Sequence, residues 1–314
     1  MFIGVDIGGT KCAVTLGDEH GAVLRKERFQ TTTVSETLDR IVAAAKELAA
    51  GNDVKACGVS CGGPLNEQRG VILCPPNLPD WDNIPVKALL EEALGVPCGV
   101  RNDANACAMA EWYFGAGRGT QNMVFMTFGT GLGAGLILNG KLFSGTCGNA
   151  GELGHMRLSA FGPSGYGKCG SFEGFCSGSG LQELGRALAR EAMQRGETVS
   201  WAANGFEHVS VAEMADAARA GDAVAKRAFD LCGQKLGEGL SIVIDLLNPE
   251  KIIIGSVFAR CQDLLVPSMR AVLEREALPS SLAVCEIVPP ALQESIGDAA
   301  ALAVARDTYD SLKG

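Results

Sequence analysis

The segment Gly4-Val-Asp-Ile-Gly-Gly-Thr-Lys11 joins an apolar strand to a glycine turn that carries an acid, a hydroxyl and a lysine. Glycines at positions 8 and 9 allow backbone N–H groups to approach an anion closely. Thr10 adds a donor, Lys11 adds positive charge, and Asp6 could hold a metal-bound water. The segment therefore fits a phosphate group, although an ordinary hairpin turn with a capping threonine is the alternative when it is taken alone.

The residues around this segment predict alternating strands and helices. Apolar runs bounded by turn residues indicate strands, and one apolar face at helical spacing indicates a helix. We expect strands at residues 2–5, 12–16, 22–29, 54–60 and 98–101, and helices at residues 35–50, 86–93 and 103–114. This order is typical of the α/β class.

A second block follows the glycine-rich stretch Gly115-Ala-Gly-Arg-Gly119, which we interpret as a linker. We expect strands at residues 123–128, 132–138, 251–254 and 284–288, and helices between residues 180 and 220 and at 222–247 and 262–276. The last helix, at residues 297–312, is apolar enough to pack back on the first block. The sequence thus predicts two α/β domains, residues 1–115 plus 297–314 and residues 116–296.

A second glycine turn, Phe128-Gly-Thr-Gly-Leu-Gly-Ala-Gly135, opens the second block in the same style. It contains a dinucleotide-like G-x-G-x-x-A spacing, but that fingerprint needs a helix after the turn, and residues 132–138 predict a strand. Two such hairpins, one in each block, indicate loops that hold the two ends of a triphosphate. Two unrelated β-turns are the alternative.

Polar side chains gather at three further places. Asn102-Asp103 stands where a strand ends and a helix begins, a common ligand position in α/β proteins. Asp103 is a candidate general base for a hydroxyl that attacks phosphorus, and a helix cap is its alternative role. Gly151-Glu-Leu-Gly-His155 and Glu173 add groups that suit a polyhydroxyl ligand, although His155 alone is equally compatible with a structural role.

Composition excludes several classes of protein. The chain has 314 residues, 12 cysteines and a net charge of −9. This charge argues against a nucleic-acid partner. The cysteine content is below that of disulfide scaffolds and favours a cytoplasmic location. The charge-free residues 119–140 contain six glycines, so we interpret them as buried strands rather than a membrane span.

Five motifs together resemble the ROK family of sugar kinases (repressors, open reading frames and kinases). They are Asp6-Ile-Gly-Gly-Thr-Lys11, Asn102-Asp103-Ala-Asn105, Phe128-Gly-Thr-Gly-Leu-Gly133, Gly151-Glu-Leu-Gly-His155 and Glu173-Gly-Phe-Cys-Ser177. The resemblance spans nearly the whole chain. It implies an actin-like, ribonuclease-H-like ATPase fold of two α/β domains, with ATP and a sugar in a cleft between them.

The resemblance also implies roles for individual residues. Asp103 would be the catalytic base. The sugar contacts would be Gly63, Asn77, Asn102, Asp103, Glu152, His155 and Glu173. The ATP and phosphate contacts would be Asp6, Gly9, Thr10, Lys11, Thr130, Gly131 and Gly255. Mg²⁺ would arrive with ATP, and Asp6 is the candidate protein group that holds it.

The chain departs from the family pattern in two places. Ser256 stands where the adenosine segment Ile252-Ile-Ile-Gly255 is usually followed by a second glycine. The family often has three cysteines that bind zinc together with the histidine matching His155. Their approximate positions here are occupied by Ser164, Tyr166 and Ser171. We therefore predict that structural zinc is absent and that packing of Tyr166, Phe172 and Phe175 orders this loop instead.

Together these features predict an ATP-dependent kinase that phosphorylates a hexose hydroxyl. Glucose is the first expected substrate, and N-acetylmannosamine, fructose and allose are alternatives. A non-catalytic sugar-binding sensor is the alternative of another class, although intact Asp103, Lys11 and glycine turns argue against it. Family repressors carry an N-terminal helix-turn-helix domain, for which we expect no room before residue 2. We expect a homodimer.

Overall fold

The computed structural model describes residues 1–203 and 205–313, apart from the side chains of residues 207 and 294. The chain forms two compact units. One comprises Met1–Phe125, Gly135–Ala150 and Pro290–Gly314, and the other comprises Met126–Ala134 and Gly151–Pro289. The domain boundaries expected at residues 116 and 297 stay a proposal.

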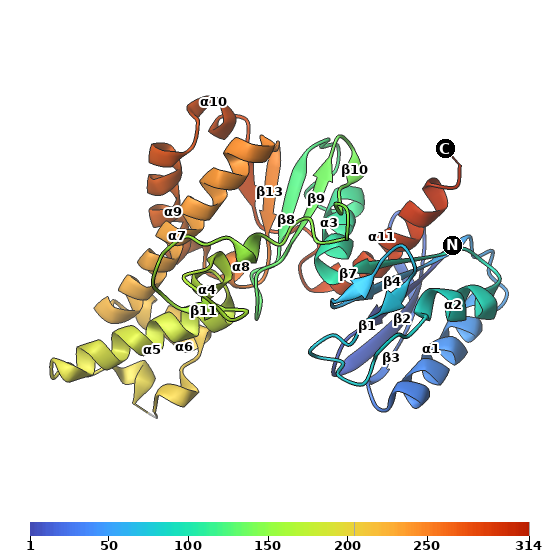
Figure 1. The fold of residues 1–314 in the computed structure, drawn as a ribbon, viewed down its shortest axis with the longest axis horizontal. Coiled ribbons are helices and arrows are strands. Elements are labelled where there is room, and N and C mark those ends of the chain that lie inside the picture. Colours follow the sequence, from blue (N-terminus) through green and yellow to red (C-terminus); the bar gives the residue numbers. More distant parts are fainter. Residues whose placement is uncertain (204, 314) are drawn as a thin grey trace. The chain divides into compact units, whose positions relative to one another are not determined.

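The first unit is built on a five-stranded sheet with the order β3-β2-β1-β4-β7 (Figure 1). Its strands are β1 (Phe2–Ile7), β2 (Lys11–Gly17), β3 (Val23–Gln30), β4 (Ala56–Cys61) and β7 (Cys98–Asn102). β1 runs antiparallel to β2 and parallel to β4, which runs parallel to β7. The unit also contains α1 (Val34–Ala49), α2 (Val86–Leu94), α3 (Asp103–Phe114), α11 (Ile296–Asp310) and the short hairpin β5 (Leu65–Asn66) and β6 (Val71–Ile72).

Both faces of this sheet are covered. Successive strand residues point to opposite faces, so alternate apolar residues enter different layers. Ile3, Val5 and Ile7 share one hydrophobic core with residues of α1 and α2. Phe2 packs instead with Leu302 of α11. The sequences of these buried strands are therefore nearly continuous runs of apolar residues.

Three glycines bring α11 close to the sheet. Gly4, Gly58 and Gly99 pair in register across β1, β4 and β7. A Cβ atom on Gly58 would overlap the Ala301 carbonyl oxygen, and one on Gly99 would overlap the Thr308 hydroxyl. Since only glycine leaves this space free, the row determines how closely the helix packs. Figure 1 shows α11, in red, beside α3 and these strands, as expected for the last helix.

The carboxyl ends of β1, β4 and β7 are level with one another. Ile7 pairs with Cys61, and Cys61 pairs with Asn102. The chain therefore leaves all three strands at the same edge of the sheet, through the turn at residues 8–10, the segment at residues 62–64 and the start of α3. Ligands in open α/β sheets bind outside this edge.

The second unit is mainly helical. Its helices are α4 (Phe172–Phe175), α5 (Gly178–Gln194), α6 (Val211–Arg219), α7 (Ala223–Leu247), α8 (Val257–Arg260), α9 (Gln262–Glu276) and α10 (Pro279–Leu282). α7 packs along α9 and also against α5 and α6. In the part of the chain that the structure describes, no helix has the length and apolar character needed to cross a bilayer.

The remaining strands form a second five-stranded sheet and a small hairpin. The sheet has the order β10-β9-β8-β13-β14. Its strands are β8 (Met123–Met126), β9 (Ala134–Leu138), β10 (Lys141–Leu142), β13 (Lys251–Ile254) and β14 (Glu286–Val288). The small hairpin consists of β11 (Ser164–Gly165) and β12 (Lys168–Cys169).

Several element bounds differ from those expected. β8 and β9 stop short of the expected residues 128 and 132, because the Gly133 N–H donates to the Thr127 side-chain oxygen (2.9 Å) rather than to a strand carbonyl. The helices expected between residues 180 and 220 are α5 and α6. Gly196 has a φ of +83°, which ends α5 after Gln194.

Candidate functional site

In the first unit, the turn after β1 is tightly held. The Gly8 N–H donates to the Lys11 carbonyl (3.1 Å), and the Thr31 N–H donates to the Thr10 carbonyl (3.0 Å). A Cβ atom on Gly9 would overlap the Asn77 carbonyl oxygen. Glycine is thus required at position 9 for close backbone approach, and the turn lies directly against the segment that carries Asn77.

A small cavity of about 130 Å³ lies beside this turn. Its lining includes three cationic side chains, Lys11, Lys26 and Arg28, and two carboxylates, Asp6 and Asp298. Lys26 already forms an ion pair with Asp298 at 2.6 Å. The surplus of positive side chains makes the cavity suitable for an anion such as a phosphate group.

The pKa of the Asp6 carboxylate is raised in this part of the structure. Burial raises its pKa to about 6, and the nearby negative charges of Asp298 and Asp103 add to the rise. The positive charges of Lys26 and Arg28 oppose it. A buried carboxylate with negative neighbours favours a proton or a cation, so Asp6 fits the expected role of holding Mg²⁺.

Asn102 and Asp103 begin α3. Asn102 is the N-cap, and its side-chain oxygen accepts a hydrogen bond from the Asn105 N–H (2.7 Å). The Asp103 carboxylate accepts a hydrogen bond from the Ala104 N–H (2.8 Å). Although the Asp103 residue is exposed, the protein surrounding its carboxylate displaces part of the bulk water and raises its pKa. A carboxylate with raised basicity and solvent access is suited to general-base chemistry.

The remaining candidates of the first unit adjoin these groups. Asn77 lies next to Gly62, since a Cβ atom there would be 3.4 Å from the Asn77 side-chain oxygen. Gly63 follows directly and is joined to Pro64 by a cis peptide bond. The structure thus brings Gly63, Asn77 and the glycine turn to the edge of the sheet at which Asp103 lies.

In the second unit, the glycine turn lies against Glu173. The Glu173 carboxylate accepts a hydrogen bond from the Leu132 N–H (2.9 Å). A Cβ atom on Gly131 would lie 2.7 Å from the same carboxylate, which explains the glycine there. The Gly178 N–H at the start of α5 donates to the Gly129 carbonyl (2.7 Å). These contacts hold the backbone around Thr130 and Gly131 in a fixed turn.

Glu152 precedes a short 3₁₀ turn, Leu153–His155, and His155 is the last residue of that turn, which packs on the same loop. A Cβ atom on Gly154 would overlap the Leu132 carbonyl and lie 3.2 Å from the Glu173 Cβ. The segment from Glu152 to His155 therefore lies beside Glu173. These three expected sugar contacts come together within the second unit.

Gly255 and Ser256 also adjoin the second glycine turn. The Gly255 N–H donates to the Met126 carbonyl (2.9 Å), and the Val257 N–H donates to the Phe128 carbonyl (3.0 Å). Ser256 has φ +53° and ψ −113°, a backbone conformation that favours glycine. The backbone thus accounts for the usual glycine at this position and shows that the serine is strained.

The residues at the zinc positions do not fit a zinc ion. The Ser171 hydroxyl caps α4 by accepting from the Gly174 N–H (3.1 Å), and Cys169 Sγ contacts the Gly162 carbonyl (3.1 Å). Among the side chains that the structure describes, no three metal-ligating groups are close enough to hold an ion. The His155 ring instead contacts the Tyr166 ring edge-on, with 5.3 Å between centroids.

The expected packing of this loop is only partly correct. Phe172 and Phe175 are buried. Tyr166 is 76% exposed, because it lies with Gly167 at the tip of the β11–β12 hairpin with a φ of +46°. Its contact with His155 is therefore made at the surface and not in a core.

Two residues near these sites carry no signal in the sequence. Thr127 closes the second glycine turn through its hydroxyl. Glu67 contacts the start of α3 from the β5–β6 hairpin. Neither belongs to a recognisable motif, and Glu67 lies 35 residues before its partner Asn102.

Comparison with known proteins places this geometry in a family. A family model described as the ROK family matches residues 2–308. The chain belongs to the ROK family. It is 35% identical over 283 residues to the glucokinase of Streptomyces coelicolor, which covers 88% of this chain and 87% of that enzyme.

Two solved ROK structures are similar over nearly the whole chain. A ROK family glucokinase from Streptomyces griseus in complex with glucose and AMPPNP is 32% identical, with a TM-score of 0.76 and coverage of 98% of this chain and 99% of that one. A ROK family transcriptional regulator, a homologue of the E. coli MLC protein, is 27% identical, with a TM-score of 0.85 and coverage of 99% and 79%. The expected actin-like ATPase fold is confirmed.

Proposed function

We propose that this ROK protein is an ATP-dependent sugar kinase that transfers the γ-phosphoryl group of ATP to a hydroxyl of a hexose. The observation that carries the proposal is the placement of Asp103. It stands at the start of α3, at the edge of the sheet where the first glycine turn also leaves β1. The similar S. griseus glucokinase was crystallised with glucose and AMPPNP, which supports both substrates.

In the proposed reaction, Asp103 accepts the proton of the attacking sugar hydroxyl. Its pKa, raised mainly by burial, makes it a better base than a fully hydrated aspartate. Gly9, Thr10 and Lys11 bind one part of the triphosphate, and Thr130 and Gly131 bind another. These donors stabilise negative charge on the transferring phosphoryl group.

Mg²⁺ is the metal that this chemistry implies. It supplies positive charge that offsets the charge of the phosphates. Asp6 is the protein group that would hold it, since its burial and its negative neighbours favour a nearby cation. Gly255 would contact the adenosine.

The proposed sugar contacts are polar side chains that accept or donate hydrogen bonds, together with the backbone of Gly63. They are Gly63, Asn77, Asn102, Asp103, Glu152, His155 and Glu173. Glucose is the first proposed substrate because glucokinases are among the similar enzymes. N-acetylmannosamine, fructose and allose are the alternatives.

A sugar-binding sensor without turnover is the second candidate, favoured by the similarity to the transcriptional regulator. ADP release measured across a panel of sugars separates the two. A kinase releases ADP with one sugar and not without it. No ADP release with any sugar of the panel, together with thermal stabilisation of the protein by a sugar, would favour the sensor.

We also propose that the protein acts in the cytoplasm as a homodimer. All twelve cysteines are free in the structure, which agrees with a reducing compartment. Sedimentation of the purified protein tests the oligomeric state, and a single species with the mass of one chain would contradict the dimer.

A further inference from the structure

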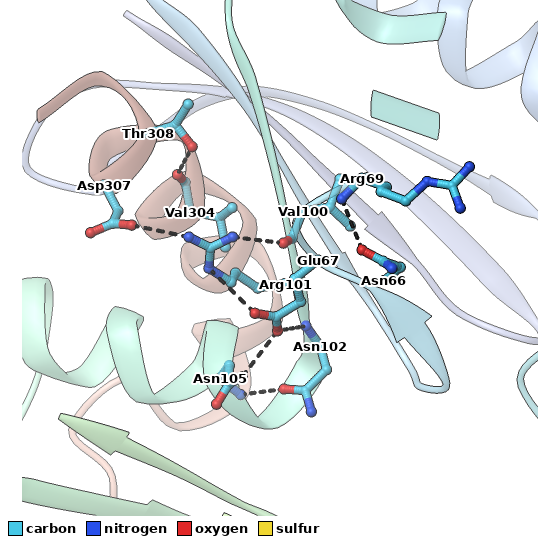
Figure 2. A network of polar contacts seen from close by, with 10 residues as sticks. All are labelled: Asn66, Glu67, Arg69, Val100, Arg101, Asn102, Asn105, Val304, Asp307 and Thr308. Atoms are coloured by element: carbon cyan, nitrogen blue, oxygen red, sulfur yellow. Dashed lines mark hydrogen bonds and ion pairs between the residues drawn. The ribbon is translucent and has the colours of Figure 1, made fainter. Parts of the chain in front are cut away.

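We propose that Glu67 is a positioning residue that holds the start of α3, and with it Asp103, in the geometry needed for catalysis. The proposal rests on the proposed role of Asp103 as the base. Glu67 belongs to the turn between β5 and β6, and it reaches the start of α3 although it is far away in the sequence (Figure 2).

One oxygen of Glu67 holds two donors of α3. Its Oε1 accepts a hydrogen bond from the backbone N–H of Asn102 (3.1 Å) and another from Asn105 Nδ2 (3.0 Å). Asn102 is the N-cap and Asp103 is the next residue, so the first bond fixes the peptide that leads into the base. Figure 2 shows the Glu67 carboxylate with its hydrogen bonds to Asn102 and Asn105.

Asn105 depends on this contact. It is fully buried, and its Oδ1 has no hydrogen-bond partner among the described residues. Its amide nitrogen must face Glu67, since a carboxylate only accepts hydrogen bonds. The first turn of α3 is therefore attached to Glu67 through both backbone and side chain.

The second oxygen of Glu67 faces Arg101. Glu67 Oε2 lies 3.9 Å from Arg101 Nε, and Arg101 Nη2 lies 3.6 Å from the Asp307 carboxylate of α11. The Glu67 side chain is only 10% exposed. A carboxylate so buried needs compensating charge and donors, and here both come from the strand and helix that carry Asn102 and Asp103.

The hairpin that carries Glu67 is itself ordered. The Arg69 N–H donates to the Asn66 side-chain oxygen (2.9 Å), which closes the turn. β5 pairs with β6 directly after Gly63 and Pro64. Glu67 thus links the segment of a proposed sugar contact, Gly63, to the helix of the proposed base. Losing this link would let the base shift relative to the sugar.

The test compares Glu67→Ala with Glu67→Gln. Alanine removes both hydrogen bonds, and we expect kcat to fall about 10- to 100-fold with KM for ATP within about twofold, because small misplacements cost that much in rate. Glutamine keeps an oxygen that accepts from both donors, so it should restore kcat to within about threefold of wild type. Gln68→Ala, at the exposed neighbour, is the control and should leave kcat unchanged.

Two kinetic outcomes would overturn the proposal. The first is a Glu67→Ala enzyme with wild-type kcat, which would leave Glu67 with a purely structural role even if its Tm falls. The second is an equal loss of kcat in Glu67→Gln, which would show that keeping the two hydrogen bonds to Asn102 and Asn105 is not enough to position the base. If the alanine variant does not fold, Glu67→Asp replaces it, since its shorter side chain cannot reach both donors.

Hydrogen exchange separates this inference from the proposed function. If the wild-type protein phosphorylates no sugar, the kinase proposal fails. Exchange at the Asn102 amide then still tests Glu67: it should be faster than wild type in Glu67→Ala and unchanged in Glu67→Gln. Equal exchange rates in all three proteins would overturn the positioning role.

Discussion

The fold buries the carboxylate of Asp6, the proposed Mg²⁺ ligand, where its negative charge is disfavoured. Its pKa rises from 3.8 to about 6, so the folded state binds a proton more readily than the unfolded state does. Unfolding free energy therefore decreases as pH rises from about 4 to about 6, and the full cost is present above that range. We interpret this lower stability at neutral pH as a consequence of keeping a carboxylate where a cation or phosphate would bind.

Replacing Asp6 by asparagine should remove this cost. We expect the unfolding free energy of Asp6→Asn to exceed that of the wild type by about 1–2 kcal/mol at neutral pH. Solvent screening of the partly exposed carboxylate keeps this gain below the full value of its pKa shift. The gain should fall towards zero at about pH 3, below the ordinary aspartate pKa of 3.8, where the wild-type carboxyl is protonated in both states. Urea unfolding at the two pH values measures this, and equal changes at both would contradict the assignment. Activity should be lost.

Ser256 offers a second test at the scale of one residue. Its φ of +53° with ψ −113° favours glycine. Ser256→Gly should therefore raise the unfolding free energy by about 1 kcal/mol, because strain of this kind costs about 1–3 kcal/mol and glycine adds some unfolded-state entropy. Thermal unfolding checks this, and a lower Tm would show that the serine side chain contributes a contact that outweighs the strain.

At this scale, the sequence offers candidate residues where they belong to compact motifs. Asp6, Gly9 and Lys11 lie close together in the sequence, so their spacing predicts a phosphate site, and that role stays a prediction. Glu67 and Thr127 could not be found in that way. Each acts through a partner that only the folded chain brings near, and a single glutamate or threonine in a loop has no distinctive pattern.

Among the elements, α11 is one whose packing could be predicted from the sequence only in part. Its apolar residues predicted packing on the first block. The row formed by Gly4, Gly58 and Gly99 could not be predicted, because it depends on strand register. The short strands β5, β6 and β10 to β12 were also missed, since two residues give no periodic signal.

Filling the glycine row should be costly. The added methyl group of Gly58→Ala would overlap the α11 backbone at Ala301, so we expect a loss of about 1–3 kcal/mol, the usual cost of overpacking. Gly297→Ala, in α11 itself, is a matched control: its Cβ atom would lie 3.6 Å from Asp6 Oδ2, an ordinary contact. Denaturant unfolding compares them, and similar stabilities would contradict the close approach.

For the whole molecule, the absence of zinc stays a prediction. Ser171, Cys169 and His155 are each engaged in other contacts, as the geometry of the loop shows. Metal analysis of the purified protein should find far less than one zinc per chain. About one tightly held zinc per chain would contradict the prediction, because closed structural sites retain their metal.

The central claim is that this chain transfers a phosphoryl group from ATP to a sugar through Asp103. The most direct measurement uses ATP labelled in its γ-phosphoryl group and follows the label into glucose and the other hexoses. Wild type should label one hexose. Asp103→Asn should bind that hexose with similar affinity but label it about 10²- to 10⁴-fold more slowly, the usual contribution of a general base. Labelling by Asp103→Asn at the wild-type rate, or no labelling of any sugar by the wild type, would contradict the account.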